Sequence, residues 1–211
     1  MDTNGLLTAV LVALLPSSVG GLAYAAEQVP LIIFLGDSLT AGYGLSEEQA
    51  FPALVGAQLE AEGIQVEIVN AGISGDTTAG GVSRLDWLLT QKPDVMVVEL
   101  GANDGLRGLS LEETVANLDD ILRRCQEAGA KVLLIGMKIP PSYGSDYAGD
   151  FEKLFERLAS QHGVAAMPFL LAGVAADPEL NQGDGIHPNA EGQRRVAANL
   201  VPYLLPLLEE P

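Results

Sequence analysis

The sequence predicts an α/β fold, a three-layer α/β/α sandwich around a central parallel sheet of five strands. Past residue 27, short apolar runs alternate with longer segments in which apolar residues recur at every third or fourth position. The short runs are apolar throughout, which is typical of strands that helices cover on both faces. Strands of this kind are parallel, and we expect the order 2-1-3-4-5 across the sheet.

Turn-forming residues mark where each predicted element ends. The strands are rich in Val, Ile and Leu, and we expect them at 30–35, 66–69, 95–100, 131–136 and, on a weaker pattern, 164–168. The helical period predicts helices at 47–62, 78–90, 111–128, 150–162 and 189–208. Pro202 and Pro206 are expected to bend or interrupt the last helix. No repeat or low-complexity linker divides the pattern, so residues 27–211 are expected to form one catalytic domain.

The first residues form a separate segment with the pattern of an export signal. Residues 6–15 are nearly all apolar, and the small-x-small pattern of a cleavage site follows at 23–25. We therefore predict a signal peptide over residues 1–26 and a periplasmic or secreted protein, with no stable membrane insertion after processing. Because Asp2 and no basic residue precedes the apolar run, a retained extension on a cytoplasmic protein stays open as the alternative.

The composition limits the kinds of partner and cofactor that this chain is expected to bind. With 28 acidic and 11 basic residues, the formal charge of -17 argues against binding to nucleic acid or to anionic lipid surfaces. Cys125 is the only cysteine and there are two histidines, so neither an internal disulfide nor a His/Cys zinc site is expected. We expect no metal and no organic cofactor, and the sequence carries no signal for an oligomeric state.

A serine, a histidine and a carboxylate stand at opposite ends of the predicted domain, and together they can activate a hydroxyl for acyl transfer. Ser38 follows the first strand, within Gly-Asp-Ser-Leu at 36–39, where it could also simply cap a turn. Asp184 lies three residues before His187, close enough to orient its imidazole. His162 is expected at the end of a helix, facing the negative end of the helix dipole, with no catalytic part.

Acyl transfer also needs hydrogen-bond donors for the oxygen that becomes negative. The N–H groups of Ser38 and Gly75 and the side-chain amide of Asn103 are the candidates, although Gly75 and Asn103 are also ordinary turn residues. Asp37, Asp76 and Asp104 are expected to brace their own loops. All these motifs follow the carboxyl ends of predicted strands, which is where ligands bind in open parallel sheets.

Four blocks of sequence, in order along the chain, carry a resemblance to a known family. They are Gly-Asp-Ser-Leu at 36–39, Ile-Ser-Gly-Asp-Thr-Thr at 73–78, Gly-Ala-Asn-Asp at 101–104 and Asp-Gly-Ile-His-Pro-Asn at 184–189. These residues resemble the SGNH, or GDSL, hydrolases, and more narrowly the bacterial thioesterase I / lysophospholipase L1 / arylesterase branch. The resemblance extends from about residue 30 to the C-terminus.

The resemblance implies the SGNH hydrolase fold and a site of known composition. It implies Ser38 as nucleophile, Asp184 and His187 as the rest of the triad, and an oxyanion hole from Ser38, Gly75 and Asn103. Ala102 departs from the glycine that relatives often have and could stiffen the loop that holds Asn103. The segment 137–147 matches a substrate-covering loop.

Three apolar residues favour a substrate with an acyl chain. Ile139 and Pro140 fall where the family contacts that chain, and Leu106 is apolar as well. We therefore predict a serine hydrolase that cleaves small-molecule carboxylic esters, and thioesters or lysophospholipids, through an acyl-enzyme on Ser38.

Other classes of protein fit parts of the same pattern. Hydroxyl-bearing residues at 38–42 are also typical of the phosphate loop of a flavodoxin-like carrier, a non-catalytic binding protein. A carbohydrate acetyl-esterase or a catalytically inactive binding module could use the same scaffold. An α/β-hydrolase fold fits less well, because the G-x-S-x-G elbow is absent.

Overall fold

The computed structural model describes Met1 and residues 29–209, so the predicted signal peptide at 1–26 lies outside the described residues apart from Met1. Five parallel strands form one sheet in the order β2-β1-β3-β4-β5, which confirms the predicted class and order. The strands are β1 (Leu31–Gly36), β2 (Glu67–Gly72), β3 (Val95–Glu99), β4 (Lys131–Ile135) and β5 (Ala165–Met167).

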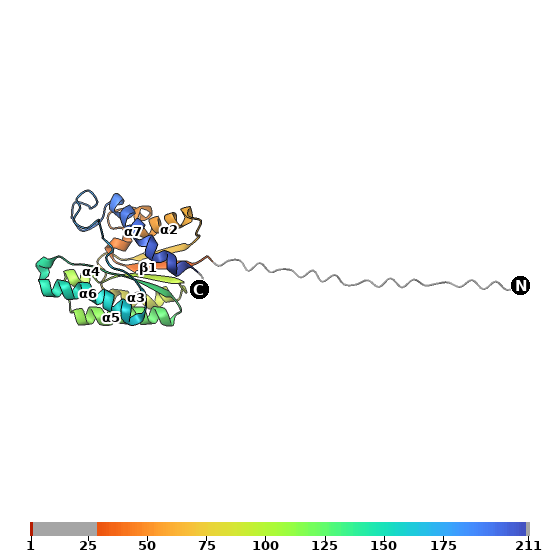
Figure 1. Ribbon diagram of the computed structural model, residues 1–211, viewed down its shortest axis with the longest axis horizontal. Helices are drawn as coiled ribbons and strands as arrows, with labels where there is room; N and C mark the ends of the chain where they lie inside the picture. The colour runs from red at the N-terminus through yellow and green to blue at the C-terminus, as the bar shows by residue number, and fades with distance from the viewer. Residues whose placement is uncertain (2–28, 210–211) are drawn as a thin grey trace.

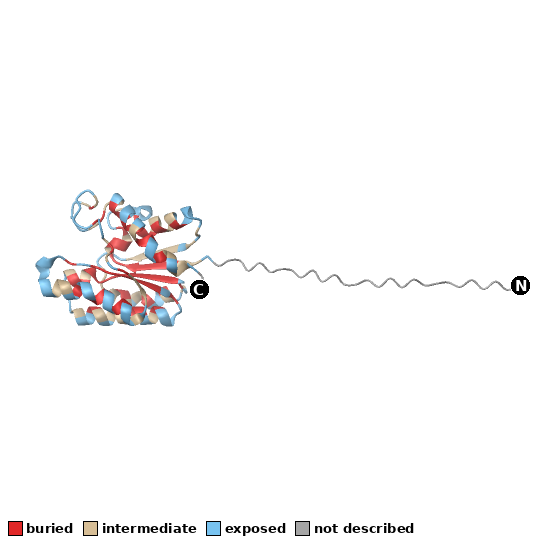
Figure 2. Cartoon of the chain, viewed as in Figure 1, coloured by how far each residue is buried: buried red, intermediate tan, exposed pale blue. Residues whose placement is uncertain are grey.

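Helices cover both faces of the sheet, as Figure 1 shows. α2 (Phe51–Ala61) packs against α7 (Ala190–Leu208) on one face. α3 (Thr78–Leu89), α5 (Leu111–Glu127) and α6 (Ser145–His162) pack side by side on the other face. The central strands β1, β3 and β4 are the most buried part of the fold, and Figure 2 shows this part in red. This burial explains their apolar character, whereas β2 at the edge of the sheet is only partly buried and contains Glu67 and Asn70.

The helix predicted at 47–62 is wrong at its start. A short 3-10 helix, η1 (Glu47–Gln49), comes first, Ala50 is extended, and α2 begins at Phe51. Pro52 explains the break, because a residue without a backbone N–H fits only in the first turn of a helix.

The two helices nearest the C-terminus are longer or more regular than predicted. α6 begins at Ser145 instead of residue 150, directly after Gly144, and a 3-10 helix, η2 (Pro141–Tyr143), precedes it. α7 runs through Pro202 and Pro206 without interruption. Both prolines lie on the exposed side of α7, where water can bond the carbonyl groups that their rings leave free. Within residues 29–209, no helix is both long and apolar enough for a membrane span.

Two helices of one turn were not predicted, α1 (Ser38–Ala41) and α4 (Ala102–Leu106). Each begins within three residues of the carboxyl end of a strand, α1 after β1 and α4 after β3. The parallel register places Gly36 of β1 opposite both Gly72 of β2 and Glu99 of β3. The loops that follow these three strands therefore meet at one rim of the sheet.

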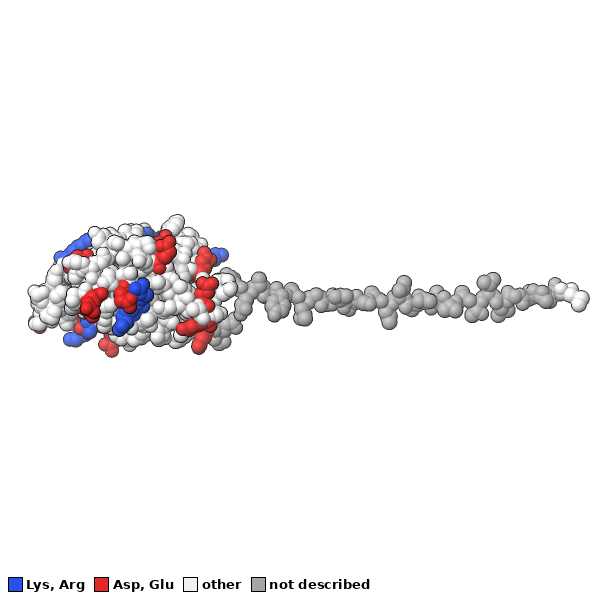
Figure 3. All heavy atoms as spheres, turned by 90° about the horizontal axis from the view of Figure 1, so that it is seen from above, with Lys and Arg blue, Asp and Glu red and all other residues white. Residues whose placement is uncertain are grey.

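Charged side chains of both signs are interspersed on the face that Figure 3 shows. Several acidic side chains pair with a basic neighbour on the same helix, for example Glu127 with Arg123 and Glu191 with Arg194. Exposed pairs of this kind contribute little to stability, so the fold depends on its apolar core.

Candidate active site

Ser38 is the first residue of α1, at the carboxyl end of β1. Asp37 caps this helix, because its carboxylate oxygen Oδ1 accepts a hydrogen bond from the Leu39 N–H at 2.9 Å. Asp37 thus braces the turn, as expected from the sequence, and Ser38 begins a helix instead of lying in an open turn. The helix fixes the direction of the Ser38 side chain.

His187 lies between Ser38 and Asp184. Its Nε2 is 2.9 Å from Ser38 Oγ, and its Nδ1 is 2.7 Å from Asp184 Oδ2. A carboxylate beside Nδ1 favours the tautomer with the proton on Nδ1, so Nε2 is free to accept the Ser38 proton. The residues come from opposite ends of the domain, and the fold brings all three into one hydrogen-bonded chain.

Asp184 is held in place by three donors. Its Oδ1 accepts the backbone N–H groups of Ile186 and His187, both at 3.0 Å, and its Oδ2 faces the imidazole. The imidazole bond, followed by these two N–H bonds, lowers the pKa of Asp184 to about 2. The carboxylate therefore stays ionised over the whole range in which the protein would act.

Tyr43 completes the surroundings of the imidazole. Its ring lies 4.6 Å from the His187 ring, centroid to centroid, and its backbone N–H donates to the Ser38 carbonyl. No sequence pattern predicted this residue, because the contact joins two loops 144 positions apart (187 minus 43). Tyr43 restricts the tilt of the ring that must serve the nucleophile.

The residues of the three predicted oxyanion donors line the same cavity. Within residues 29–209, no acceptor takes the backbone N–H of Ser38 or of Gly75. Gly75 has a φ of +82°, which only glycine adopts without strain and which sets the direction of this N–H. Asn103 lies in α4, and its Nδ2 donates to Asp37 Oδ2 at 3.0 Å, which leaves its second amide hydrogen free.

These groups line one cavity of about 570 Å³, in the size range of small-molecule sites. Ser38, His187, Gly75 and Asn103 are among its lining residues. The predicted substrate residues Leu106, Ile139 and Pro140 also line the cavity. Met137 and Lys138 of the predicted substrate-covering segment line it too. Further lining residues, which the sequence did not single out, are Phe169, Leu171, Ala175 and Ala176.

Comparison with known proteins places this arrangement in a family. Residues 34–195 match the GDSL-like Lipase/Acylhydrolase family. The chain belongs to this family.

Its relatives include several named enzymes. Esterase TesA of Pseudomonas aeruginosa is 43% identical over a region that covers 87% of this chain and 91% of the length of that esterase. Thioesterase 1/protease 1/lysophospholipase L1 of Escherichia coli (strain K12) is 38% identical over 89% of each chain. The crystal structure of the psychrotrophic esterase EstA from Pseudoalteromonas sp., inhibited by monoethylphosphonate, matches with a TM-score of 0.81 and 34% identity over 85% of this chain and 99% of that one.

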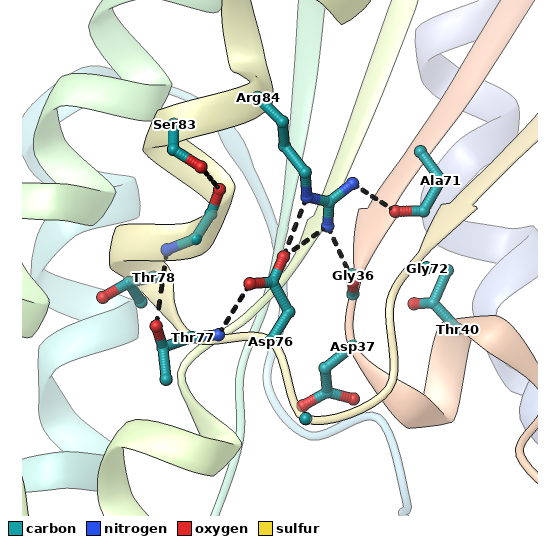
Figure 4. A network of polar contacts seen from close by, with 12 residues as sticks. Gly36, Asp37, Thr40, Ala71, Gly72, Asp76, Thr77, Thr78, Ser83 and Arg84 are labelled. Carbon is teal, nitrogen blue, oxygen red and sulfur yellow. Dashed lines mark hydrogen bonds and ion pairs between the residues drawn. The ribbon is translucent and has the colours of Figure 1, made fainter.

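Arg84 of α3 holds the loop that carries Gly75 in place. No motif in the sequence of this GDSL-family chain indicated this role for Arg84. Figure 4 shows its guanidinium between the carboxyl ends of β1 and β2. It donates to the carbonyl groups of Gly36 and Ala71 at 2.9 and 2.5 Å, and it pairs with Asp76 at 2.8 Å. Because one rigid side chain joins two strands to Asp76, the neighbouring Gly75 N–H is held in position.

Asp104 braces the opposite loop. It accepts bonds from the N–H and the hydroxyl of Thr78 at 3.0 and 2.6 Å, which joins α4 to the start of α3. Asp76 and Asp104 thus hold loops, as the sequence suggested. Ala102 is the first helical residue of α4, where alanine is favourable, and the positive φ of 112° falls on Gly101 before it.

Two other reactive side chains lie away from the cavity. His162 ends α6, and its Nε2 is 2.7 Å from Asp119 Oδ1, so a carboxylate as well as the end of the helix faces it. Cys125 is buried in α5, and burial raises the pKa of its thiol to about 12. Its thiolate is thus not formed near neutral pH. Within residues 29–209, no cluster of three His, Cys, Asp or Glu side chains could hold a metal ion.

We expect Asn103→Ala to lower kcat by on the order of 10²- to 10³-fold, because the predicted oxyanion hole loses one of its three donors. Steady-state hydrolysis of a p-nitrophenyl ester measures the effect, and circular dichroism checks the fold. Asn199→Ala is a matched control, since its amide only bonds the Ala172 carbonyl on the surface. A kcat that stays within about twofold of the wild-type value would remove Asn103 from the oxyanion hole.

Proposed function

We propose that this chain hydrolyses carboxylic esters and thioesters of apolar acyl groups through an acyl-enzyme on Ser38. One observation carries the proposal, the continuous hydrogen-bonded chain from Ser38 Oγ through the His187 ring to Asp184. The membership of the family and the names of the relatives, which include esterases and a thioesterase/lysophospholipase, support the reaction class.

The first half of the reaction forms the acyl-enzyme. Ser38 Oγ attacks the carbonyl carbon while His187 Nε2 takes the hydroxyl proton. The carbonyl oxygen becomes negative and accepts bonds from the N–H groups of Ser38 and Gly75 and from the Asn103 amide. Asp184 stabilises the imidazolium, which then gives its proton to the leaving alcohol or thiol as the tetrahedral intermediate collapses.

The second half releases the acid. Water enters the place of the leaving group, and His187 Nε2 takes a proton from it as its oxygen attacks the acyl carbon. The second tetrahedral intermediate uses the same three donors. Its collapse returns the proton to Ser38 Oγ, and the carboxylic acid leaves.

The wall of the cavity supports an apolar acyl group. Leu106, Ile139 and Leu171 offer hydrocarbon surface, and the lysine at its edge, Lys138, is paired with Glu152 at 2.6 Å. A polyhydroxyl substrate needs several polar partners for its hydroxyl groups, so a carbohydrate acetyl-ester fits this wall less well.

The phosphate-loop alternative also fits the geometry less well. In a flavodoxin-like carrier, the hydroxyl groups after β1 would face a phosphate. Here the Thr40 hydroxyl is fully buried and donates to Glu99 Oε2 at 2.7 Å, and Ser38 Oγ is bonded to His187.

We also propose that residues 1–26 are an export signal and that the enzyme acts in the periplasm or outside the cell. The apolar run at 6–15 and the small residues at 23–25 support this. Mass spectrometry of the protein expressed in full length in a Gram-negative host tests it. A cleaved chain in the periplasmic fraction is expected, and a cytoplasmic chain that keeps residues 1–26 would contradict it.

Two assays test the reaction and the substrate class. An alkyl fluorophosphonate should label the protein once, with the adduct on the peptide that contains Ser38. A series of p-nitrophenyl esters from acetyl to palmitoyl, with palmitoyl-CoA and acetylated xylan, should show kcat/KM rising from acetyl to longer chains. Labelling of a different residue contradicts the mechanism, and a preference for acetylated xylan contradicts the acyl-chain assignment.

A further inference from the structure

Glu99 is a buried carboxyl group that the reaction steps above do not use. It ends β3, a strand whose other residues are all apolar, and its exposed fraction is 0%. Its Oε2 accepts bonds from the Thr40 hydroxyl at 2.7 Å and from the Asp37 N–H at 3.2 Å. Glu99 therefore lies directly under the turn that carries Ser38.

The packing around Glu99 is tight. A Cβ atom added to Gly36 would lie 2.7 Å from Glu99 Oε2 and 1.9 Å from Thr40 Oγ1. Glycine is thus the residue that lets the end of β1 approach this carboxyl group. So close an approach keeps the distance between Glu99 and the nucleophile turn nearly fixed.

The second oxygen of Glu99 indicates where a proton lies. Oε1 is buried, and no N–H or O–H group in residues 29–209 donates to it. The Asp37 N–H bonds Oε2, so the two carboxyl groups are neighbours, and a proton on one of them avoids two negative charges side by side in a buried place. The unpartnered Oε1 therefore carries a proton or lies beside one.

Asp37 is the ionised partner in this pair. Burial raises the pKa of Asp37 to about 6, and the bonds that its carboxylate accepts from the Leu39 N–H and the Asn103 amide limit this rise, so Asp37 is ionised at neutral pH. Glu99 is fully buried, and burial together with the charge of Asp37 raises the pKa of Glu99 well above its usual value. The proton therefore belongs to Glu99.

We propose that Glu99 is a positioning residue for the oxyanion hole, acting through Asp37 on Ser38 and Asn103. The carboxyl group of Glu99 holds the Asp37 backbone through Oε2, and the Asp37 carboxylate in turn caps α1 and orients the Asn103 amide. This inference rests on the proposed function of Ser38 and Asn103. It adds Glu99 as a residue that positions both of them without taking part in the reaction.

The proposal has a consequence for the dependence on pH. The charged group next to Glu99 is Asp37 at the start of α1, His187 acts in turn on Asp37, and Arg84 of α3 bonds the Gly36 carbonyl. When Glu99 loses its proton at alkaline pH, two carboxylates repel each other in a buried place. We expect kcat to fall on the alkaline side for this reason.

Glu99→Gln and Glu99→Leu form the matched pair of variants. Glutamine keeps an oxygen for the Thr40 hydroxyl and the Asp37 N–H, and it cannot ionise. Leucine keeps the bulk and removes every polar contact. We expect E99Q to retain kcat within about threefold, and E99L to lose on the order of 10- to 100-fold in kcat with little change in KM. E99Q should also remove the alkaline fall in kcat.

A double-mutant cycle tests the route through Asn103. If Glu99 acts on the oxyanion hole, E99L should cost about threefold or less when Asn103 is already alanine. Equal losses in the two backgrounds overturn the proposal, as does a folded E99L with wild-type kcat. If E99L does not fold, an alkaline fall that persists unchanged in E99Q overturns it by itself.

Failure of the inference is distinct from failure of the proposed function. Loss of ester hydrolysis in Ser38→Ala with no effect of the Glu99 variants leaves the acyl-enzyme mechanism intact and removes only the positioning role. Hydrolysis that survives in Ser38→Ala removes the mechanism itself.

Discussion

Ser38→Ala should lower kcat for a p-nitrophenyl ester by on the order of 10⁶-fold, the largest loss we expect from any single substitution. Without Oγ there is no acyl-enzyme, and His187 has no hydroxyl proton to take. The oxyanion donors and the cavity remain, so a slow attack by water on bound ester is the only route left. KM should stay close to that of the wild-type protein.

The control for this substitution is Ser160→Ala. Ser160 is an exposed residue of α6 that does not line the cavity, and its replacement should leave kcat unchanged. Labelling with the alkyl fluorophosphonate should disappear in Ser38→Ala and persist in the control. A loss of less than about tenfold in Ser38→Ala would mean that another group is the nucleophile.

Local patterns were sufficient to predict the class and strand order of the fold. The strands are short runs rich in apolar residues, most of them buried at the centre of the sheet, and the helices between them show the helical period over many residues. The predicted helices were wrong or missing where the pattern covers too few residues. α1 and α4 have four and five residues, too few for a period to show. The start of α2 depends on a single proline, Pro52.

The candidate site was predictable where its residues follow strand ends. Ser38, Gly75, Asn103 and the Asp184–His187 pair all belong to short motifs in such loops, and the register of β1 with β2 and β3 brings the first three together. The resemblance to the family then assigned each a role. Their roles remain predictions, and the geometry on which they depend is in place.

The supporting residues could not be predicted from motifs. Arg84 bonds Gly36, which lies 48 positions earlier, and Tyr43 meets His187 across the mouth of the cavity. Such contacts depend on the final packing and leave no periodic trace. Glu99 did carry a signal, since a single charged residue in a strand expected to be covered on both faces needs a partner or a proton.

Asp184→Asn should lower kcat by on the order of 10⁴-fold, the second largest loss we expect. The asparagine oxygen would keep the bonds from the Ile186 and His187 N–H groups, which places the amide nitrogen opposite His187 Nδ1. An amide donor at that position favours the tautomer with the proton on Nε2. Nε2 would then face Ser38 with a hydrogen and could not accept the hydroxyl proton.

Asp184→Ala separates this tautomer effect from the loss of charge. The Asp184 side chain is 38% exposed, so water can replace the carboxylate and accept the proton of Nδ1. We therefore expect alanine to cost less than asparagine, although alanine is the smaller side chain. Steady-state kinetics of both variants on one p-nitrophenyl ester gives the comparison, with circular dichroism as the check on folding. If alanine is as damaging as asparagine, the contribution of Asp184 is its charge, and the orientation of the imidazole is set by Tyr43 and the loop.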